Sequence, residues 1–197
     1  MHLLGRFGRK CGFAVALGAF ACVTACSHVV TGQPVAGVHD APTQGSPTVT
    51  WREHVLPTDC LLSGRQMSDL AGVEIDDGRD TEIKRSDGTA GHSCNYYTTA
   101  GGVLSFTATI KIQSPSTGVI TKQLLADIGD PGATEVPGIG RRMIIEPLTR
   151  PDAFPAMRVA TDKYLANVVL VVGNIPAPPD VAAWTRAASE ILKALPA

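Results

Sequence analysis

The chain is poor in the residues from which metal centres and nucleophilic active sites are usually built. Of its five cysteines, only Cys60 and Cys94 lie beyond residue 26, and aromatic residues make up 5% of its 197 positions. It contains no His-Glu-x-x-His motif, no Asn-x-Ser/Thr acceptor and no internal repeat. Its apolar runs all fall short of the about 20 residues that a membrane-spanning helix needs. We therefore expect neither a zinc protease of this motif, nor a repeat protein, nor a permanent membrane span.

The charge balance is mildly acidic. The chain has 17 Lys and Arg against 18 Asp and Glu, and three of the basic residues lie in the first 25 positions, which hold no acidic residue. Without those positions the formal charge is −4, from 14 basic and 18 acidic residues. Such a chain offers no basic surface for phosphates, so we expect no nucleic-acid partner and no polybasic lipid-binding patch.

The first 25 residues have the composition of a secretory signal peptide. Arg6, Arg9 and Lys10 precede a short apolar segment, residues 12–25, which ends in small side chains. A positive start, a short apolar centre and small residues at the end are the marks of a segment that is cut off during export. We therefore predict a signal peptide over residues 1–25.

The last four residues of this region, Val23-Thr24-Ala25-Cys26, resemble the lipobox of bacterial lipoproteins. The resemblance implies that the Cys26 thiol receives a diacylglycerol and becomes the new N-terminus after cleavage. Fatty acids such as palmitate then hold the protein at the cell membrane, on its extracytoplasmic side, because two acyl chains give stable anchoring where one does not. The alternative is an ordinary secretory signal with an incidental cysteine.

Residues 26–50 are predicted to be the lipidated cysteine and a flexible tether, and residues 51–197 a single folded domain. The tether is rich in Pro, Gly, Ser and Thr and has no apolar periodicity, so it buries too little surface to offset the entropy of ordering it. The 172 residues left after cleavage suit one domain plus such a tether.

Cys60 and Cys94 are predicted to form a disulfide, because a pair of cysteines in an oxidising compartment is most simply a bridge. Closing a loop of about 35 residues would stabilise the fold by about 3–4 kcal/mol in the chain-entropy model. A metal site is the alternative. His92 lies near Cys94, but no matching Cys or His lies near Cys60, so we expect neither a metal nor another cofactor.

The periodicities predict an α+β fold, with a single antiparallel sheet and two or three packed helices. The strongest strand signal is residues 103–112, where Leu104, Phe106, Ala108, Ile110 and Ile112 fall on one face. A Ser63–Gln66 capping box predicts a helix that ends at Gly72, and Asp180 starts an amphipathic C-terminal helix with Trp184 on its apolar side. Further strands are expected over residues 73–75, 93–98, 142–146, 156–161 and 164–172, and a further helix over residues 120–128.

Three segments resemble functional motifs without meeting their requirements. Residues 91–95, Gly-His-Ser-Cys-Asn, lack the second glycine of a nucleophile elbow. The acidic residues Asp76, Asp77, Asp80 and Glu82 do not have the spacing of a calcium loop and are expected to form a solvated turn. Residues 138–140, Gly-Ile-Gly, are followed by no helix pattern and are expected to be a turn rather than a phosphate loop.

Two short patterns carry a resemblance to a known family. Asp59-Cys60-Leu61-Leu62-Ser63, a short helix, and then Ser93-Cys94-Asn95-Tyr96 resemble actinobacterial cell-envelope lipoproteins of mycobacterial type whose domain has no assigned function. Val136-Pro137-Gly138-Ile139-Gly140 resembles a later element of that family, and the apolar strand with a terminal helix is distantly similar to the extracellular sensor domain of mycobacterial serine/threonine kinases. The resemblance implies an antiparallel sheet with packed helices, a Cys60–Cys94 bridge, a binding or sensing role and no catalytic residues.

The sequence thus predicts a non-catalytic, membrane-anchored lipoprotein that binds an unidentified envelope ligand or protein. One alternative is a carrier of a lipid or other apolar ligand, which needs a cavity of about 300 Å³ or more. The other is an envelope hydrolase that uses His92 or His54 with a nearby serine or aspartate, which needs a hydroxyl within about 3.2 Å of an imidazole nitrogen.

Overall fold

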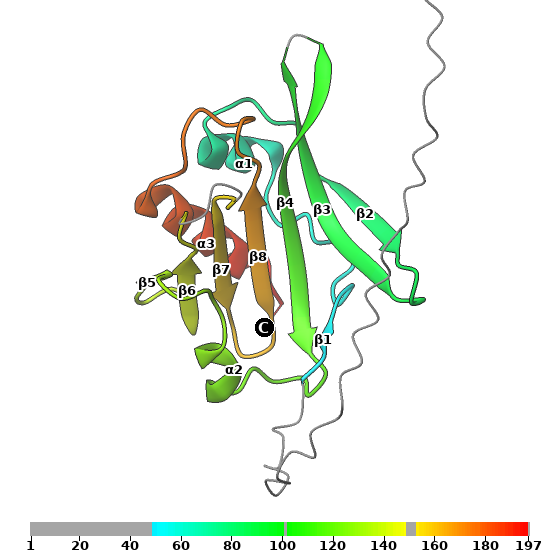
Figure 1. The fold of residues 1–197 in the computed structure, drawn as a ribbon, viewed down its shortest axis with the longest axis vertical. Helices are drawn as coiled ribbons and strands as arrows, with labels where there is room; N and C mark the ends of the chain where they lie inside the picture. The colour runs from blue at the N-terminus through cyan, green and yellow to red at the C-terminus, as the bar shows by residue number, and fades with distance from the viewer. Residues whose placement is uncertain (1–48, 101, 149–152, 197) are drawn as a thin grey trace, which may run out of the picture. The chain divides into compact units, whose positions relative to one another are not determined.

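A computed structural model describes residues 49–100, 102–148 and 153–196. They form one antiparallel sheet in the order β2-β3-β4-β8-β7-β6-β5, with β1 pairing on β4, and three helices pack on it (Figure 1). The α+β class and the single antiparallel sheet are therefore confirmed. The elements are β1 Trp51–Arg52, α1 Gly64–Ala71, β2 Arg79–Lys84, β3 Ala90–Ala100, β4 Val103–Pro115, α2 Lys122–Ala126, β5 Thr134–Val136, β6 Arg142–Ile145, β7 Ala156–Ala160, β8 Leu165–Leu170 and α3 Val181–Ala194.

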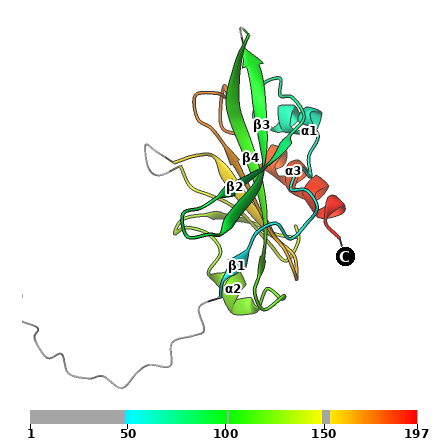
Figure 2. The same cartoon turned by 90° about the vertical axis from the view of Figure 1, so that its right-hand side faces the viewer.

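Helices α1 and α3 cover one face of the sheet (Figure 2). The expected capping box starts α1: the Ser63 side chain accepts from the Gln66 amide, and the Gln66 side chain accepts from the Ser63 amide. Gly72 ends it in the left-handed conformation, and Asp180 caps α3. Each large side chain buried here contributes about 1.5–3 kcal/mol. The largest buried side chains of this main core are Trp184, Tyr96, Met67, Ile110, Ile112, Met143, Met157, Leu170 and Ile191.

The short helix α2 covers only one end of the opposite face (Figure 1). A small second core lies beneath it, made of Ile120, Ile128, Ile144, Ala160 and Leu165. The Arg142 guanidinium closes the end of α2, because it donates to the main-chain carbonyls of Leu125, Ala126 and Ile128. The rest of this face carries no covering element among the described residues, and we call it the open face.

A β-bulge divides β4, so the prediction of one continuous apolar face along this strand was wrong. Tyr96 pairs with Ala108 but Tyr97 pairs with Phe106, so the register shifts by one residue at that point. Since a bulge adds one residue to one strand, the alternation of faces reverses across it. Ala108, Ile110 and Ile112 are fully buried, whereas Leu104 and Phe106 are exposed.

Two further predictions of local structure were wrong, one of a strand and one of a turn. Residues 73–75 are not a strand, because the Ser68 hydroxyl takes up the Ile75 amide and the chain turns there. Asp80 and Glu82, predicted to lie in a solvated turn together with Asp76 and Asp77, lie instead on strand β2, which has five of its six residues exposed. Because β2 lies at the edge of the sheet and pairs only with β3, polar and charged side chains suit it.

Candidate functional site

A groove of about 530 Å³ lies on the open face, between β1, the sheet and α2. Strands β4, β8 and β7 form its floor, and α2 forms one wall. Its residues combine one aromatic ring, several aliphatic side chains and a set of amides and charges, the composition typical of small-molecule sites. They are Trp51, Thr109, Lys111, Gln113, Leu124, Asp127, Ile128, Arg158, Leu165, Asn167 and Val169.

Three polar side chains cross the floor of the groove in one row. Lys111 on β4 pairs with Asn167 on β8, and Asn167 pairs with Arg158 on β7, so all three point to the open face at neighbouring positions. The Asn167 amide also donates to Oε1 of Gln113 at 3.1 Å, which fixes its orientation. The row thereby presents preordered hydrogen-bonding groups to whatever enters the groove.

A carboxylate accompanies each cation of this row. Lys111 Nζ lies 3.3 Å from Oε1 of Glu53, and Arg158 Nε lies 3.1 Å from Oε1 of Glu146. Burial alone would raise the pKa of Glu53, but Arg85, the His92 amide and Lys111 outweigh it and hold the pKa below its ordinary value. Since the charges are compensated within the protein, the groove does not demand an anionic ligand.

Trp51 supplies the aromatic surface of the groove. It is half-buried, pairs with Pro115 at the end of β4 and packs on the small core beneath α2. An aromatic ring held in this way offers a flat apolar face at little entropic cost, beside the polar row on the sheet. A second hollow, of about 350 Å³, lies between the outer sides of α1 and α3 and is lined by helix-surface residues such as Gln66 and Glu190.

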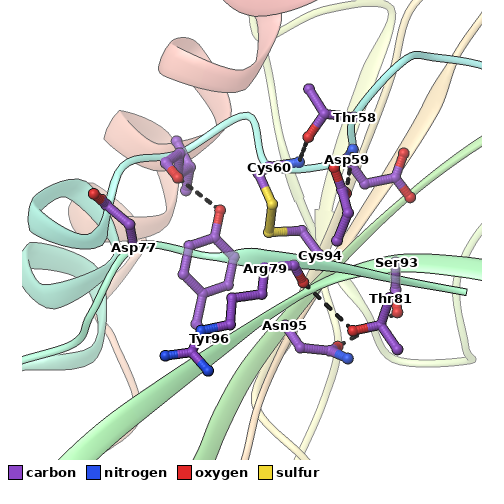
Figure 3. Close-up of a disulfide and its surroundings, with 12 residues drawn as sticks. Thr58, Asp59, Cys60, Asp77, Arg79, Thr81, Ser93, Cys94, Asn95 and Tyr96 are labelled. Atoms are coloured by element: carbon purple, nitrogen blue, oxygen red, sulfur yellow. Dashed lines mark hydrogen bonds between the residues drawn. A yellow bond between two sulfur atoms is a disulfide. The ribbon is translucent and has the colours of Figure 1, made fainter.

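The predicted disulfide is confirmed, with an S–S distance of 2.06 Å between Cys60 and Cys94 (Figure 3). It ties the segment before α1 to β3, and Cys94 is fully buried. The neighbouring Tyr96 hydroxyl donates to the Leu62 carbonyl at 2.7 Å, and burial raises the Tyr96 pKa. Gly78 packs so tightly against Cys94 and Tyr96 that a Cβ would clash with both. These contacts make a rigid structural corner.

His92, one of the two histidines considered for catalysis, is buried among carboxylates. Its Nδ1 lies 3.3 Å from Oδ2 of Asp59 without hydrogen-bond geometry, and its Nε2 lies 3.8 Å from Oδ1 of Asp80. The His54 ring stacks on it with centroids 4.3 Å apart, and His54 has a positive φ of 54°. In the part of the chain that the structure describes, no serine hydroxyl hydrogen bonds to either ring. The contact that a serine–histidine hydrolase requires is therefore missing there.

Asp59 is the most deeply buried charged residue of this group, with no exposed surface. Its Oδ2 accepts from the Ile112 amide at 3.2 Å, while its Oδ1 has no hydrogen-bond partner. Burial, helped by the Asp80 charge, outweighs the Ile112 amide and His92 and raises the Asp59 pKa. Asp59, His92 and Asp80 together join the segment of residues 53–62 to β2 and β3, which is a structural role.

The acidic cluster of the sequence is divided in the structure. Asp77 accepts from the Gly64 amide at the start of α1, Asp80 accepts from the Asp59 amide, and Glu82 lies beside His54. Over residues 49–100, 102–148 and 153–196, the one metal-sized set is Cys60, Asp80 and Cys94. Because both sulfurs are joined in the disulfide, this set offers a metal no thiolate.

The two arginines after residues 138–140 are also committed to structure. Arg141 Nη1 lies 2.7 Å from Oδ1 of Asp162 and donates to the Ile120 carbonyl, and Arg142 closes α2. Neither presents a free guanidinium for an anionic ligand. Cys26, the predicted site of lipidation, lies outside the described residues. No helix within those residues has the length and apolarity to cross a bilayer.

Comparison with protein-family models, with curated proteins and with solved structures gives no match for this chain. The groove was not predicted from the sequence. The alternation of Thr109 and Lys111 with Ala108, Ile110 and Ile112 did place these two polar side chains on the polar side of one strand. Arg158 and Asn167 gave no such signal, because their position beside Lys111 depends on the pairing of β4, β8 and β7.

Proposed function

We propose that this protein is an extracytoplasmic lipoprotein, anchored through Cys26, whose single domain binds an envelope ligand in the open-face groove without transforming it. The supporting observation is the row of Lys111, Asn167 and Arg158 across a sheet face that the described residues leave uncovered. A side-chain row fixed by its own hydrogen bonds and ion pairs is preorganised, which lowers the entropic cost of binding.

The chemistry of the groove favours an uncharged, polyhydroxylated ligand, such as a glycan of the cell envelope. Both cations are compensated by Glu53 and Glu146, so a free anion would have to compete with built-in carboxylates. Amide, hydroxyl and guanidinium groups donate to and accept from hydroxyl groups. Trp51 and the aliphatic side chains of the groove add apolar surface for the flat face of a sugar ring. A lipid carrier would be expected to line its groove with fewer polar groups.

The mature protein, presented with envelope glycans, peptides and lipids, tests this function by native mass spectrometry and isothermal titration. Asn167→Val removes the central amide of the row and suits a strand position. We expect it to weaken binding by about tenfold, since losing a hydrogen bond costs about 1–1.5 kcal/mol. Thr81→Val is the matched control, on β2 and outside the groove. Equal affinities for the two variants and the wild type would place the ligand elsewhere.

A further inference from the structure

One end of the sheet is formed by two uncharged segments that meet. Residues 95–110 and residues 164–179 contain no Asp, Glu, Lys, Arg or His. The Val171 amide donates to the Thr107 carbonyl at 2.8 Å, and the Asn174 side chain donates to the Phe106 carbonyl at 2.6 Å. Figure 1 shows the β3–β4 hairpin extending beyond the helices at this end of the sheet. The two longest stretches of the folded domain without a charged residue therefore meet at this end of the sheet.

This end also carries most of the large apolar side chains that the fold leaves exposed. Val103, Leu104 and Phe106 lie on the hairpin with 65%, 51% and 41% of their surface exposed. Val172 follows β8 and Phe154 precedes β7, and the bond from the Leu170 amide to the Pro155 carbonyl brings them to the same end. We call these five residues the apolar end. Exposed apolar side chains gathered at one end of a folded domain mark a candidate interaction site.

The bulge in β4 is what exposes two of these side chains. In an unbroken strand Leu104 and Phe106 would share the buried face with Ala108 and Ile110. The register shift places Phe106 opposite Tyr97 instead, with their rings 5.9 Å apart in an edge-to-face arrangement. Bulges that redirect a side chain are commonly associated with functional surfaces.

The order of side chains along the hairpin identifies the surface that it fits. Val103 and Leu104 lie at the turn, Phe106 and Tyr97 come next, and the Arg79 guanidinium lies 5.9 Å from the Tyr97 ring centre behind them. Side chains partition across a lipid interface in the same order: aliphatic groups lie deepest, aromatic rings lie at the boundary, and cations lie behind them on the water side. Because this order matches a lipid interface, we take a lipid layer as the occupant and leave a protein partner as an outcome of the test.

We propose that the apolar end docks onto the lipid layer in which the protein is anchored. The proposal rests on the proposed anchoring at Cys26. The 24 residues between Cys26 and Trp51 span up to about 80 Å, whereas the 13 residues of β4 span about 44 Å. The hairpin therefore reaches the membrane even though β1 pairs at the opposite end of β4. The anchor keeps the hairpin at high local concentration, so shallow insertion of a few side chains is sufficient.

The test places a tryptophan at the apolar end of the lipidated mature protein in phosphatidylcholine vesicles that contain brominated lipid. Phe106→Trp is compared with Ile83→Trp, which puts the same ring at an exposed apolar position on β2, away from this end. The emission of the wild type, which comes from Trp51 and Trp184, is subtracted from the emission of each variant. We expect the Phe106→Trp emission to shift to the blue and to be quenched at least twofold more than that of Ile83→Trp.

The outcomes separate docking from anchoring. If the lipidated protein floats with the vesicles but the two variants are quenched equally, docking is overturned while anchoring stands. If the mature protein carries no lipid, anchoring is overturned, and docking is decided by adding the Phe106→Trp and Ile83→Trp chains to excess vesicles. Stronger quenching of Phe106→Trp supports docking there, and equal quenching overturns it. Adding Val103→Ser and Leu104→Ser, both at exposed positions, should abolish the difference without unfolding the domain.

Discussion

The side chain of Glu53 joins the segment after β1 to two strands, because it accepts from the His92 amide on β3 while it pairs with Lys111 on β4. Arg85 completes its surroundings with two contacts, of 3.0 and 3.2 Å. Glu53 thereby holds the segment after β1 against the sheet and fixes Lys111 at the groove. One carboxylate links the stability of the fold to the geometry of the candidate site.

Glu53→Gln is expected to destabilise the protein by about 1.5–3 kcal/mol at neutral pH, the range for hydrogen bonds to a charged group. Because the folded-state pKa of Glu53 is below its ordinary value, its stabilisation is present above the unfolded pKa and is lost as pH falls through the folded pKa. Urea unfolding at pH 7 and near pH 3 measures this, with the exposed Glu74→Gln as the control. If Glu53→Gln lowers the unfolding free energy as much near pH 3 as at pH 7, the lowered pKa of Glu53 is contradicted.

Asp59 should show the opposite pH trend. Burial raises its folded-state pKa, so ionisation costs more in the folded than in the unfolded state, and protonation during a fall in pH favours folding. Asp59→Asn is neutral at all pH values and has nearly the same shape. The unfolding free energy of this variant minus that of the wild type should be largest at neutral pH. It should decline as the pH falls through the folded-state pKa of Asp59. A constant difference between pH 7 and pH 4 would show that Asp59 is not shifted as the burial implies.

The bulge predicts a contrast between two residues of one strand. Leu104→Ala should cost less than about 1 kcal/mol, because the side chain is half-exposed, whereas Ile110→Ala should cost about 2–5 kcal/mol, because its side chain is fully buried. Thermal and denaturant unfolding of the two variants gives the comparison. Similar large losses for both would mean that the strand is unbroken and that Leu104 lies in the core.

Reduction of the Cys60–Cys94 bridge should lower the unfolding free energy by about 3–4 kcal/mol, because the unfolded chain gains the freedom of the opened loop. Denaturant curves of the protein with and without reductant measure the change. Cys60→Ala with Cys94→Ala serves as the control, since reductant should then have no effect. A loss below about 1 kcal/mol would assign the stability of this corner to packing around Tyr96 and Gly78 instead.

The sequence predicted the elements whose signals are local. Ser63, Gln66 and Gly72 define α1 within ten residues, and Asp180 does the same for the start of α3. The disulfide followed from the number of cysteines. The β4 bulge and strand β2 were missed because they depend on pairing: the extra residue at Thr107 exists only relative to β3, and β2 is a strand only because β3 offers it an edge. The groove was missed for the same reason, since Arg158 and Lys111 lie 47 positions apart and meet through Asn167.

Amide chemical-shift mapping of the labelled mature protein, titrated with envelope glycans, tests most directly whether the open face binds the ligand. We predict that the largest shifts fall on Trp51, Lys111, Arg158 and Asn167, with saturation at one ligand per chain. Shifts confined to the surfaces of α1 and α3, or a spectrum that no glycan changes while a peptide or lipid does, would contradict the claim.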